Sequence, residues 1–146
     1  MFNSILVVCV GNICRSPVGE RVLQAALPNL IVSSAGVAAL VGNPADPDAA
    51  SVAAERGISL DGHSARQFTA QLGASHDLIL TMEPGHRAEI IRMYPQLSGK
   101  TMLFDQWSGA KGIEDPYQLS QDVHRKILDQ ILVASEAWVS KLSRKK

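Results

Sequence analysis

Two residues near the N-terminus pair a nucleophile with an anion-binding group: Cys9, and Arg15 six positions later. The segment between them, CVGNICRS, contains Gly11 and Asn12, residue types that tolerate the positive φ of a curled backbone. A curled backbone turns successive N–H groups to one side and forms a nest for an oxyanion, and arginine binds two phosphate oxygens with its planar fork. We therefore predict a phosphate-binding loop made by Val10, Gly11, Asn12, Ile13, Cys14 and Ser16, with the Cys9 thiol beneath the phosphorus atom.

The residues around Cys9 favour a reactive thiol over a cysteine that merely packs in the core. A cysteine at the end of a buried strand is usually a small core residue. A cysteine followed six places later by arginine also arises by chance in roughly one chain in ten. Here a strand precedes the loop and Ser16-Pro17 opens a helix after it, so amide dipoles, a helix N-terminus and a guanidinium would all favour the nucleophilic thiolate.

Strand and helix signals alternate along the chain. Ser4 to Cys9 is apolar and typical of a central parallel strand, and a helix is expected from the N-cap Ser16 through Val18, Val22 and Ala26 to Pro28. Further strands are predicted at 30–34, 76–82 and 100–104. Further helices are predicted at 46–56, 84–93 and from 120 onward, the last with an apolar face formed by Val123, Ile127, Ile131, Ala134, Trp138 and Leu142. This alternation predicts a doubly wound, four-stranded parallel α/β sheet with helices on both faces, a flavodoxin-like three-layer fold with the phosphate loop after the first strand.

Size and composition set limits on the function. The 146 residues suit a single domain over 1–146, and 14 basic residues balance 14 acidic ones, so we expect no nucleic-acid partner. The apolar run from Ile5 to Val10 is too short for a membrane span, which indicates a cytoplasmic protein without membrane insertion. Two cysteines are too few for a disulfide framework, and the basic end at 144–146 is expected to be frayed.

A phosphate ester bound over Cys9 needs a proton donor for its leaving group and a base to activate water, and one carboxyl group can serve both steps. The sequence offers two Asp-Pro pairs. Asp46 stands where a helix begins and is more simply an N-cap, whereas Asp115 lies in the polar loop from Gly109 to Tyr117, beyond the last strand. The residues alone favour Asp115 and leave Asp46 open.

These motifs resemble a known family. The segment VCVGNICRSP is similar to the signature of the low-molecular-weight protein tyrosine phosphatases, and the resemblance continues in SSAG (33–36), GHSARQ (62–67), DLILTM (77–82) and DPY (115–117). It extends nearly end to end. The bacterial branch that is paired with tyrosine autokinases of capsule and exopolysaccharide export looks closest.

The resemblance implies roles for individual residues. It places the general acid in DPY, at Asp115, and makes Tyr117 and Leu40 the two walls of the substrate slot. It also implies a hydrogen-bond network that holds the loop in shape, formed by Asn12, Ser16, Ser34 and His63, with Ser16 donating to the Cys9 thiolate. We expect His76, His86 and His124 to be ordinary exposed or hydrogen-bonded residues.

Cys14 lies inside the loop, and two interpretations of it stay open. In the family, this neighbour forms a disulfide with the nucleophile under oxidants and prevents its irreversible oxidation. The alternative is a packed thiol without a redox role.

The resemblance implies hydrolysis of phosphotyrosine through a cysteinyl-phosphate intermediate, without a metal or cofactor. Phosphate or other oxyanions are expected as ligands or inhibitors, and the protein partner is expected to be a membrane tyrosine autokinase.

Other functions fit the sequence less well. An arsenate reductase would need cysteines after Cys14, and the chain has none. A protein-arginine phosphatase is the alternative, although its family typically has threonine where Ile13 stands. A phosphocarrier module or a silent binding module would need neither Arg15 nor Asp115.

Overall fold

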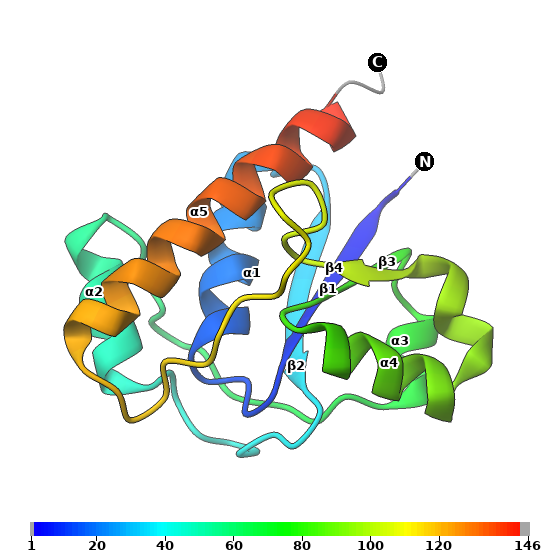
Figure 1. The fold of residues 1–146 in the computed structure, drawn as a ribbon, viewed down its shortest axis with the longest axis horizontal. Coiled ribbons are helices and arrows are strands. Elements are labelled where there is room, and N and C mark those ends of the chain that lie inside the picture. The colour runs from blue at the N-terminus through cyan, green and yellow to red at the C-terminus, as the bar shows by residue number, and fades with distance from the viewer. Residues whose placement is uncertain (1, 144–146) are drawn as a thin grey trace.

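The computed structural model describes residues 2–143, which form a parallel sheet with helices on both faces (Figure 1). The strands are β1 (Ser4–Cys9), β2 (Ile31–Gly36), β3 (Leu78–Thr81) and β4 (Thr101–Leu103). Their order in the sheet is β2-β1-β3-β4, and every neighbouring pair is parallel. The predicted doubly wound, four-stranded sheet is therefore confirmed.

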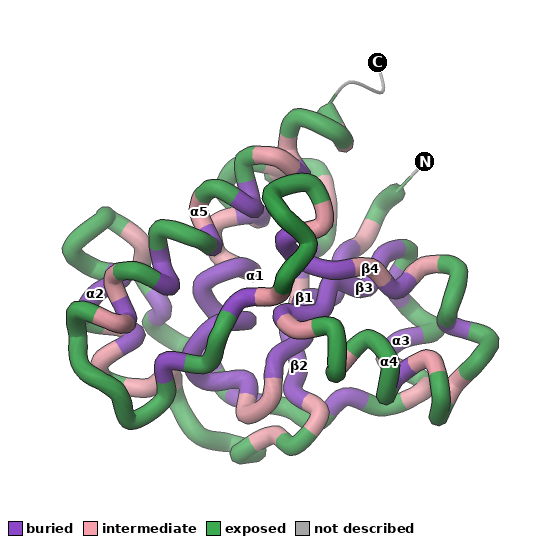
Figure 2. Tube along the Cα trace, in the orientation of Figure 1, coloured by how far each residue is buried: buried purple, intermediate pink, exposed green. Residues whose placement is uncertain are grey.

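β1 runs through the centre of the sheet because its side chains are apolar on both faces. Ile5 and Val7 pack in the core beneath α1 (Arg15–Ala26), α2 (Pro47–Glu55) and α5 (Gln121–Ser143). Leu6 and Val8 belong to the core on the opposite face. That second face is covered by α3 (Ala70–Ala74), α4 (Pro84–Met93) and a 3₁₀ helix, η1 (Pro95–Lys100). Figure 2 shows the central strands buried between exposed outer turns.

The first helix differs from its prediction. α1 begins at Arg15 with Cys14 at the N-cap, and Ser16 lies inside the first turn. Ser16 is therefore not at the cap position, and its hydroxyl contacts Cys9 Sγ and Asn12 Nδ2 instead. Of the residues that gave the helical spacing, Val18 is buried and Ala26 is exposed, while Leu23 is fully buried.

Other predictions were closer. The 84–93 helix has the predicted bounds, and α5 buries the predicted apolar face. Asp46 caps α2 as predicted, because its carboxylate accepts from the N–H groups of Asp48 and Ala49 at 3.1 Å. β2 starts one residue late and continues to Gly36, while β3 and β4 are shorter than predicted. α3 and η1 were missed because they are too short to show a helical period. The basic end at 144–146 lies outside the described residues.

Within residues 2–143, no helix combines the length and apolar character that a membrane span requires.

Candidate active site

The segment between β1 and α1 is anchored from the outside through its carbonyl groups. The backbone oxygens of five consecutive residues, 9–13, accept hydrogen bonds from beyond the loop; the donors, in order, are the N–H groups of Val37, Ala38 and Leu40, the His63 ring and the N–H of Asp46. Because these carbonyl groups point outward, the N–H groups of the curled segment are directed to its inner side. The N-terminus of α1 meets the same inner side and adds its positive dipole end. The loop is thus shaped to hold an anion.

Two backbone features allow the curl. Asn12 has a φ of 61°, as expected, but Gly11 lies outside the positive-φ region, so the expectation for Gly11 was wrong. The second feature is Gly36 at the end of β2, where a Cβ atom would lie 2.2 Å from the carbonyl oxygen of Val10. Only a residue without a side chain lets β2 approach the loop this closely. The loop therefore needs a glycine at position 36, where β2 approaches it closely, and the sequence analysis had assigned the need for glycine to position 11.

The Asn12 side chain is the centre of a buried hydrogen-bond network. Its Nδ2 donates to Ser16 Oγ at 2.7 Å and to Ser34 Oγ at 2.9 Å, and its Oδ1 accepts from the N–H of Arg66 at 2.9 Å. Ser16 Oγ also lies 2.9 Å from Cys9 Sγ. Since Ser16 Oγ accepts from Asn12, its own proton is free to point toward the sulfur. The structure thus brings together Asn12, Ser16, Ser34 and His63, the four residues expected to support the loop.

Two members of this network were missed by the sequence analysis. Ser34 donates to Glu20 Oε1 at 2.6 Å, and Arg66 Nε donates to the carbonyl oxygen of Ser34 at 3.0 Å. Glu20 follows Ser16 by four positions, so both lie on one face of α1. That spacing was the available signal for Glu20.

The Arg15 guanidinium is buried beneath the loop, with 1% of its surface exposed. Its Nη1 donates to Glu83 Oε2 at 2.5 Å and to the carbonyl oxygen of Ile113 at 2.6 Å, while Nη2 lies 3.7 Å from Asp115 Oδ2. Glu83 follows β3 and was also missed. Its position at the carboxyl end of a parallel strand, the edge where ligands bind in such sheets, was the signal that could have identified it.

A pocket of about 170 Å³ opens over the thiol of Cys9. It is lined by Cys9, Val10, Gly11, Ile13, Cys14, Arg15, Ala38, Leu40, Asp115 and Tyr117. Leu40 and Tyr117 are each about two-fifths exposed, so they form the rim, and Asp115 Oδ1 accepts from the N–H of Tyr117 at 3.0 Å. This bond fixes the turn that holds Asp115 at the pocket. The residues predicted to be catalytic and those predicted to form the two walls therefore meet in one cavity.

Cys14 lines the same pocket but differs chemically from Cys9. Burial raises the pKa of the Cys14 thiol far above its usual value, and the negative charges of Asp46 and Asp115 act in the same direction. Both cysteines are free thiols. Cys14 is therefore a neutral thiol at neutral pH.

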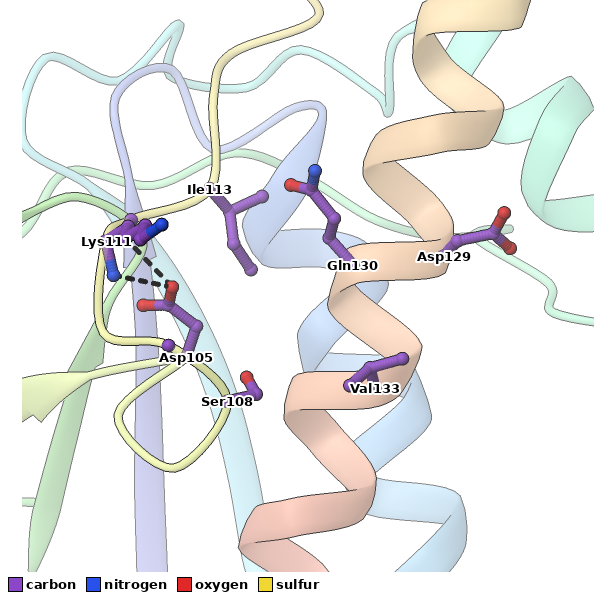
Figure 3. A pocket seen from close by; sticks show the side chains of 9 residues that line it. Asp105, Ser108, Lys111, Ile113, Asp129, Gln130 and Val133 are labelled. Atoms are coloured by element: carbon purple, nitrogen blue, oxygen red, sulfur yellow. Dashed lines mark hydrogen bonds between the residues drawn. The ribbon is translucent and has the colours of Figure 1, made fainter.

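A larger cavity, of about 340 Å³, lies elsewhere, between the 105–113 loop and α5 (Figure 3). Its walls carry Asp105 and Asp129 but neither cysteine nor arginine. Asp105 Oδ2 is occupied by the N–H groups of Lys111 and Gly112, at 3.1 and 3.0 Å, so it shapes the loop. Size alone would point to this cavity, whereas the nucleophile and the anion-binding groups lie in the smaller one.

A doubly wound sheet with a cysteine, an amide-lined loop and an arginine after its first strand defines a class of α/β proteins that bind a phosphate group beside a thiol. The sequence profile of one such family, described as low molecular weight phosphotyrosine protein phosphatase, matches residues 4–146. The chain belongs to this family.

Individual relatives agree with the family assignment. The low molecular weight protein-tyrosine-phosphatase Etp of Escherichia coli K12 is 52% identical over 143 residues, which cover 98% of this chain and 97% of Etp. The structure of Vibrio vulnificus Wzb in complex with benzylphosphonate superposes with a TM-score of 0.94 at 49% identity, over 97% of this chain and 99% of that one. The YwlE arginine phosphatase from Geobacillus stearothermophilus also superposes, with a TM-score of 0.92, but at 32% identity, over 99% of this chain and 95% of that one.

Proposed function

We propose that this protein hydrolyses phosphotyrosine through a cysteinyl-phosphate intermediate on Cys9. The observation that carries the proposal is the shared pocket: the Cys9 thiol at its floor, Arg15 beside it and the Asp115 carboxyl group in its wall. In the first step, the Cys9 thiolate attacks phosphorus and forms an S–P bond while the P–O bond to the phenol oxygen breaks. Asp115, protonated at this stage, transfers its proton to the departing oxygen.

The second step regenerates the enzyme. Asp115, now a carboxylate, takes a proton from water as the water oxygen attacks phosphorus. The S–P bond breaks, inorganic phosphate leaves, and the electron pair returns to the sulfur as thiolate. The Ser16 hydroxyl, 2.9 Å from Cys9 Sγ, stabilises that thiolate both as nucleophile and as leaving group.

Arg15 supplies positive charge at the phosphate. Its Nη1 is held by Glu83 and by the carbonyl oxygen of Ile113, which fixes the plane of the guanidinium. We expect the rest of the group to bind two phosphate oxygens as charge moves onto them in the transition state. The inward N–H groups of the loop supply the remaining donors, and no step of this scheme uses a metal or cofactor.

The walls of the pocket support an aryl phosphate as substrate. Leu40 and Tyr117 stand at the rim, and Ile13 adds an apolar surface within the loop. A phenyl ring can lie against such walls. The likeness to Wzb, solved with benzylphosphonate, supports binding of a ligand that joins a phosphonate or phosphate group to a benzyl or aryl group. Leucine at position 40 stacks less strongly than an aromatic residue, so Tyr117 would provide most of the ring contact.

The physiological partner we propose is a membrane tyrosine autokinase of exopolysaccharide export, whose phosphotyrosines the enzyme would remove in the cytoplasm. The support for this partner is the similarity to the bacterial phosphatases Etp and Wzb. We further propose that residues 1–146 act as one domain, since the family profile and the described fold span nearly the whole chain.

A protein-arginine phosphatase is the second candidate, because the YwlE structure shares the fold at 32% identity. The apolar side chain of Ile13, which is buried in the loop and lines the pocket, favours an aryl group over a guanidinium. Tyrosine-type relatives are also more similar in sequence, at about one half identical.

One assay distinguishes these functions. Phosphotyrosine and phosphoarginine peptides of the same sequence are offered to wild-type, Cys9→Ser and Asp115→Asn proteins in excess chelator, and released phosphate is measured. We expect rapid hydrolysis of phosphotyrosine by the wild type, strongly slowed hydrolysis by Asp115→Asn and none by Cys9→Ser. Preference for phosphoarginine would establish the second candidate, and activity that survives Cys9→Ser would contradict both cysteine mechanisms.

A further inference from the structure

A group of metal-ligating side chains lies outside the pocket, where the start of α2 meets the start of α5, two helices that pack side by side (Figure 1). Asp46 is the N-cap of α2, Asp48 lies in the first turn of that helix, and His124 comes from the first turn of α5. One ligand atom from each residue can be chosen so that all three lie within 4.8 Å of one another.

The His124 ring is the most informative member of this group. Only 3% of the residue is exposed, and its buried Nε2 has no hydrogen-bond partner among the described residues. A buried polar atom without a partner is costly and therefore calls for an explanation. The expectation that His124 is simply exposed or hydrogen-bonded was thus wrong.

The ligand atoms lie near one another without a direct hydrogen bond between His124 and Asp46. His124 Nε2 lies 3.9 Å from Asp46 Oδ2, which is too long for a hydrogen bond. Two ligand atoms that share one tetrahedral zinc ion at 2.0–2.1 Å are about 3.3 Å apart. His124 Nε2 and Asp46 Oδ2 would therefore approach by about 0.6 Å, and the remaining pairs, which lie within 4.8 Å, by at most about 1.5 Å, movements that side-chain rotation can supply.

The charges also favour a cation. Across residues 2–143, neither Asp46 nor Asp48 forms an ion pair with a lysine or arginine. Gln121, one turn before His124, donates to Asp48 Oδ1 at 3.2 Å and orients that carboxylate toward α5. Two carboxylates and one imidazole form a donor set suited to zinc, with the fourth position left to water.

We propose that Asp46, Asp48 and His124 bind one Zn²⁺ ion at a site separate from the catalytic pocket. The site lies behind the phosphate loop: the N–H of Asp46 donates to the carbonyl oxygen of Ile13 at 2.9 Å, and His124 borders a small cavity together with Cys14 and Pro116. A metal there would join α2 to α5 directly beneath the loop. Zinc binding should therefore stabilise the fold, whichever reaction the pocket performs.

The thiols of Cys9 and Cys14 are also potential zinc ligands, so the experiment must distinguish zinc bound in the catalytic pocket from zinc bound at the proposed site. Zn²⁺ is titrated calorimetrically, in phosphate-free and chelator-free buffer, into wild-type protein and into a Cys9→Ser, Cys14→Ser protein. We expect both to bind one ion at this site, and the thermal unfolding midpoint of both to rise with zinc. Loss of all zinc binding in the protein without thiols would overturn the proposal.

Substitutions of the ligands complete the experiment in the same thiol-free protein. Asp48→Asn and His124→Gln should each weaken zinc binding by about tenfold or more. Asp122→Asn, on the same turn of α5 but outside the group, should leave it unchanged. Asp48 is only partly buried, unlike His124, so its variant remains informative even if His124→Gln does not fold.

A crystal soaked in Zn²⁺, with diffraction measured at the zinc edge, locates the ion directly. The expected anomalous peak lies between Asp46 and His124. Affinity that Asp48→Asn leaves unchanged, or a peak elsewhere in the thiol-free protein, would refute the site.

Discussion

Arg15 Nη1 lies 2.5 Å from Glu83 Oε2, in a contact that joins the phosphate loop to the end of β3. The arginine is buried and the carboxylate is partly exposed, with 39% of its side-chain surface accessible. Glu83 also stands 3.8 Å from the His86 ring. Glu83 therefore sets the orientation of the group that we expect to bind phosphate.

Replacing Glu83 tests this orientation. Glu83→Gln keeps the shape of the side chain but removes the charge, and a hydrogen bond to a charged partner contributes about 1.5–3 kcal/mol. We expect kcat/KM for an aryl phosphate to fall about tenfold or more, because each 1.36 kcal/mol of transition-state binding is a factor of ten.

Glu89→Gln is the matched control, since Glu89 is exposed on α4 and, among residues 2–143, forms an ion pair with Arg92 alone. Steady-state kinetics of the two variants should separate them. Equal kcat/KM for Glu83→Gln and wild type would show that Arg15 is positioned without Glu83.

The close approach of β2 to the loop predicts a strong effect at Gly36. In Gly36→Ala the new Cβ would meet the backbone oxygen of Val10 at 2.2 Å, so the loop must move. We expect a loss of about 1–3 kcal/mol in the free energy of unfolding, together with weaker binding of inorganic phosphate. Gly99→Ala, where a Cβ meets nothing within 4 Å, serves as the control in denaturant titration. A Gly36→Ala protein as stable as Gly99→Ala would contradict the steric argument.

The sequence predicted the sheet and the loop well because both have local signals. β1 is a continuous apolar run, and CVGNICRS places its cysteine, asparagine and arginine within seven positions. The 84–93 helix was bounded by its proline, and Asp46 was recognised as an N-cap from the Asp-Pro pair. Each of these features depends on neighbouring residues alone.

The missed residues depend on contacts between distant segments. Glu83 meets Arg15 across 68 positions, and the N–H of Arg66 meets Asn12 across 54. Only the parallel arrangement of β1, β2 and β3 brings these segments to one edge of the sheet. His124 was called ordinary for the same reason, because nothing near it in the sequence shows that its Nε2 is buried beside Asp46.

The raised pKa of Cys14 predicts how stability depends on pH. Folded Cys14 keeps its proton above about pH 9, the ordinary value for a thiol, whereas the unfolded chain loses it. The unfolded state then binds fewer protons, so the free energy of unfolding falls as pH rises, by at most about 1.4 kcal/mol per pH unit. Below that pH this contribution is fully present.

Cys14→Ser removes the titrating group and should flatten this part of the profile. Urea unfolding of wild type and Cys14→Ser between pH 8 and about 10 measures the difference. Parallel profiles for the two proteins would show that Cys14 titrates alike in the folded and unfolded states.

A redox role for Cys14 has its own test. Peroxide converts the Cys9 thiolate to a sulfenic acid, and the Cys14 thiol can condense with it to form a disulfide and release water. We expect activity of peroxide-treated wild type to return with dithiothreitol, whereas Cys14→Ser should lose activity permanently by further oxidation of Cys9. Equal recovery of both proteins would make Cys14 a packing residue only.

The central claim is that the phosphoryl group passes through Cys9, and a trapping experiment tests it most directly. Asp115→Asn protein is mixed with an aryl phosphate in excess chelator, quenched within milliseconds to seconds, digested and analysed by mass spectrometry. The account predicts one phosphoryl group on the peptide that contains Cys9, released as inorganic phosphate on longer incubation. Hydrolysis without any phosphoryl group on Cys9 would contradict this claim. Hydrolysis of the substrate by the Cys9→Ser protein would contradict it as well.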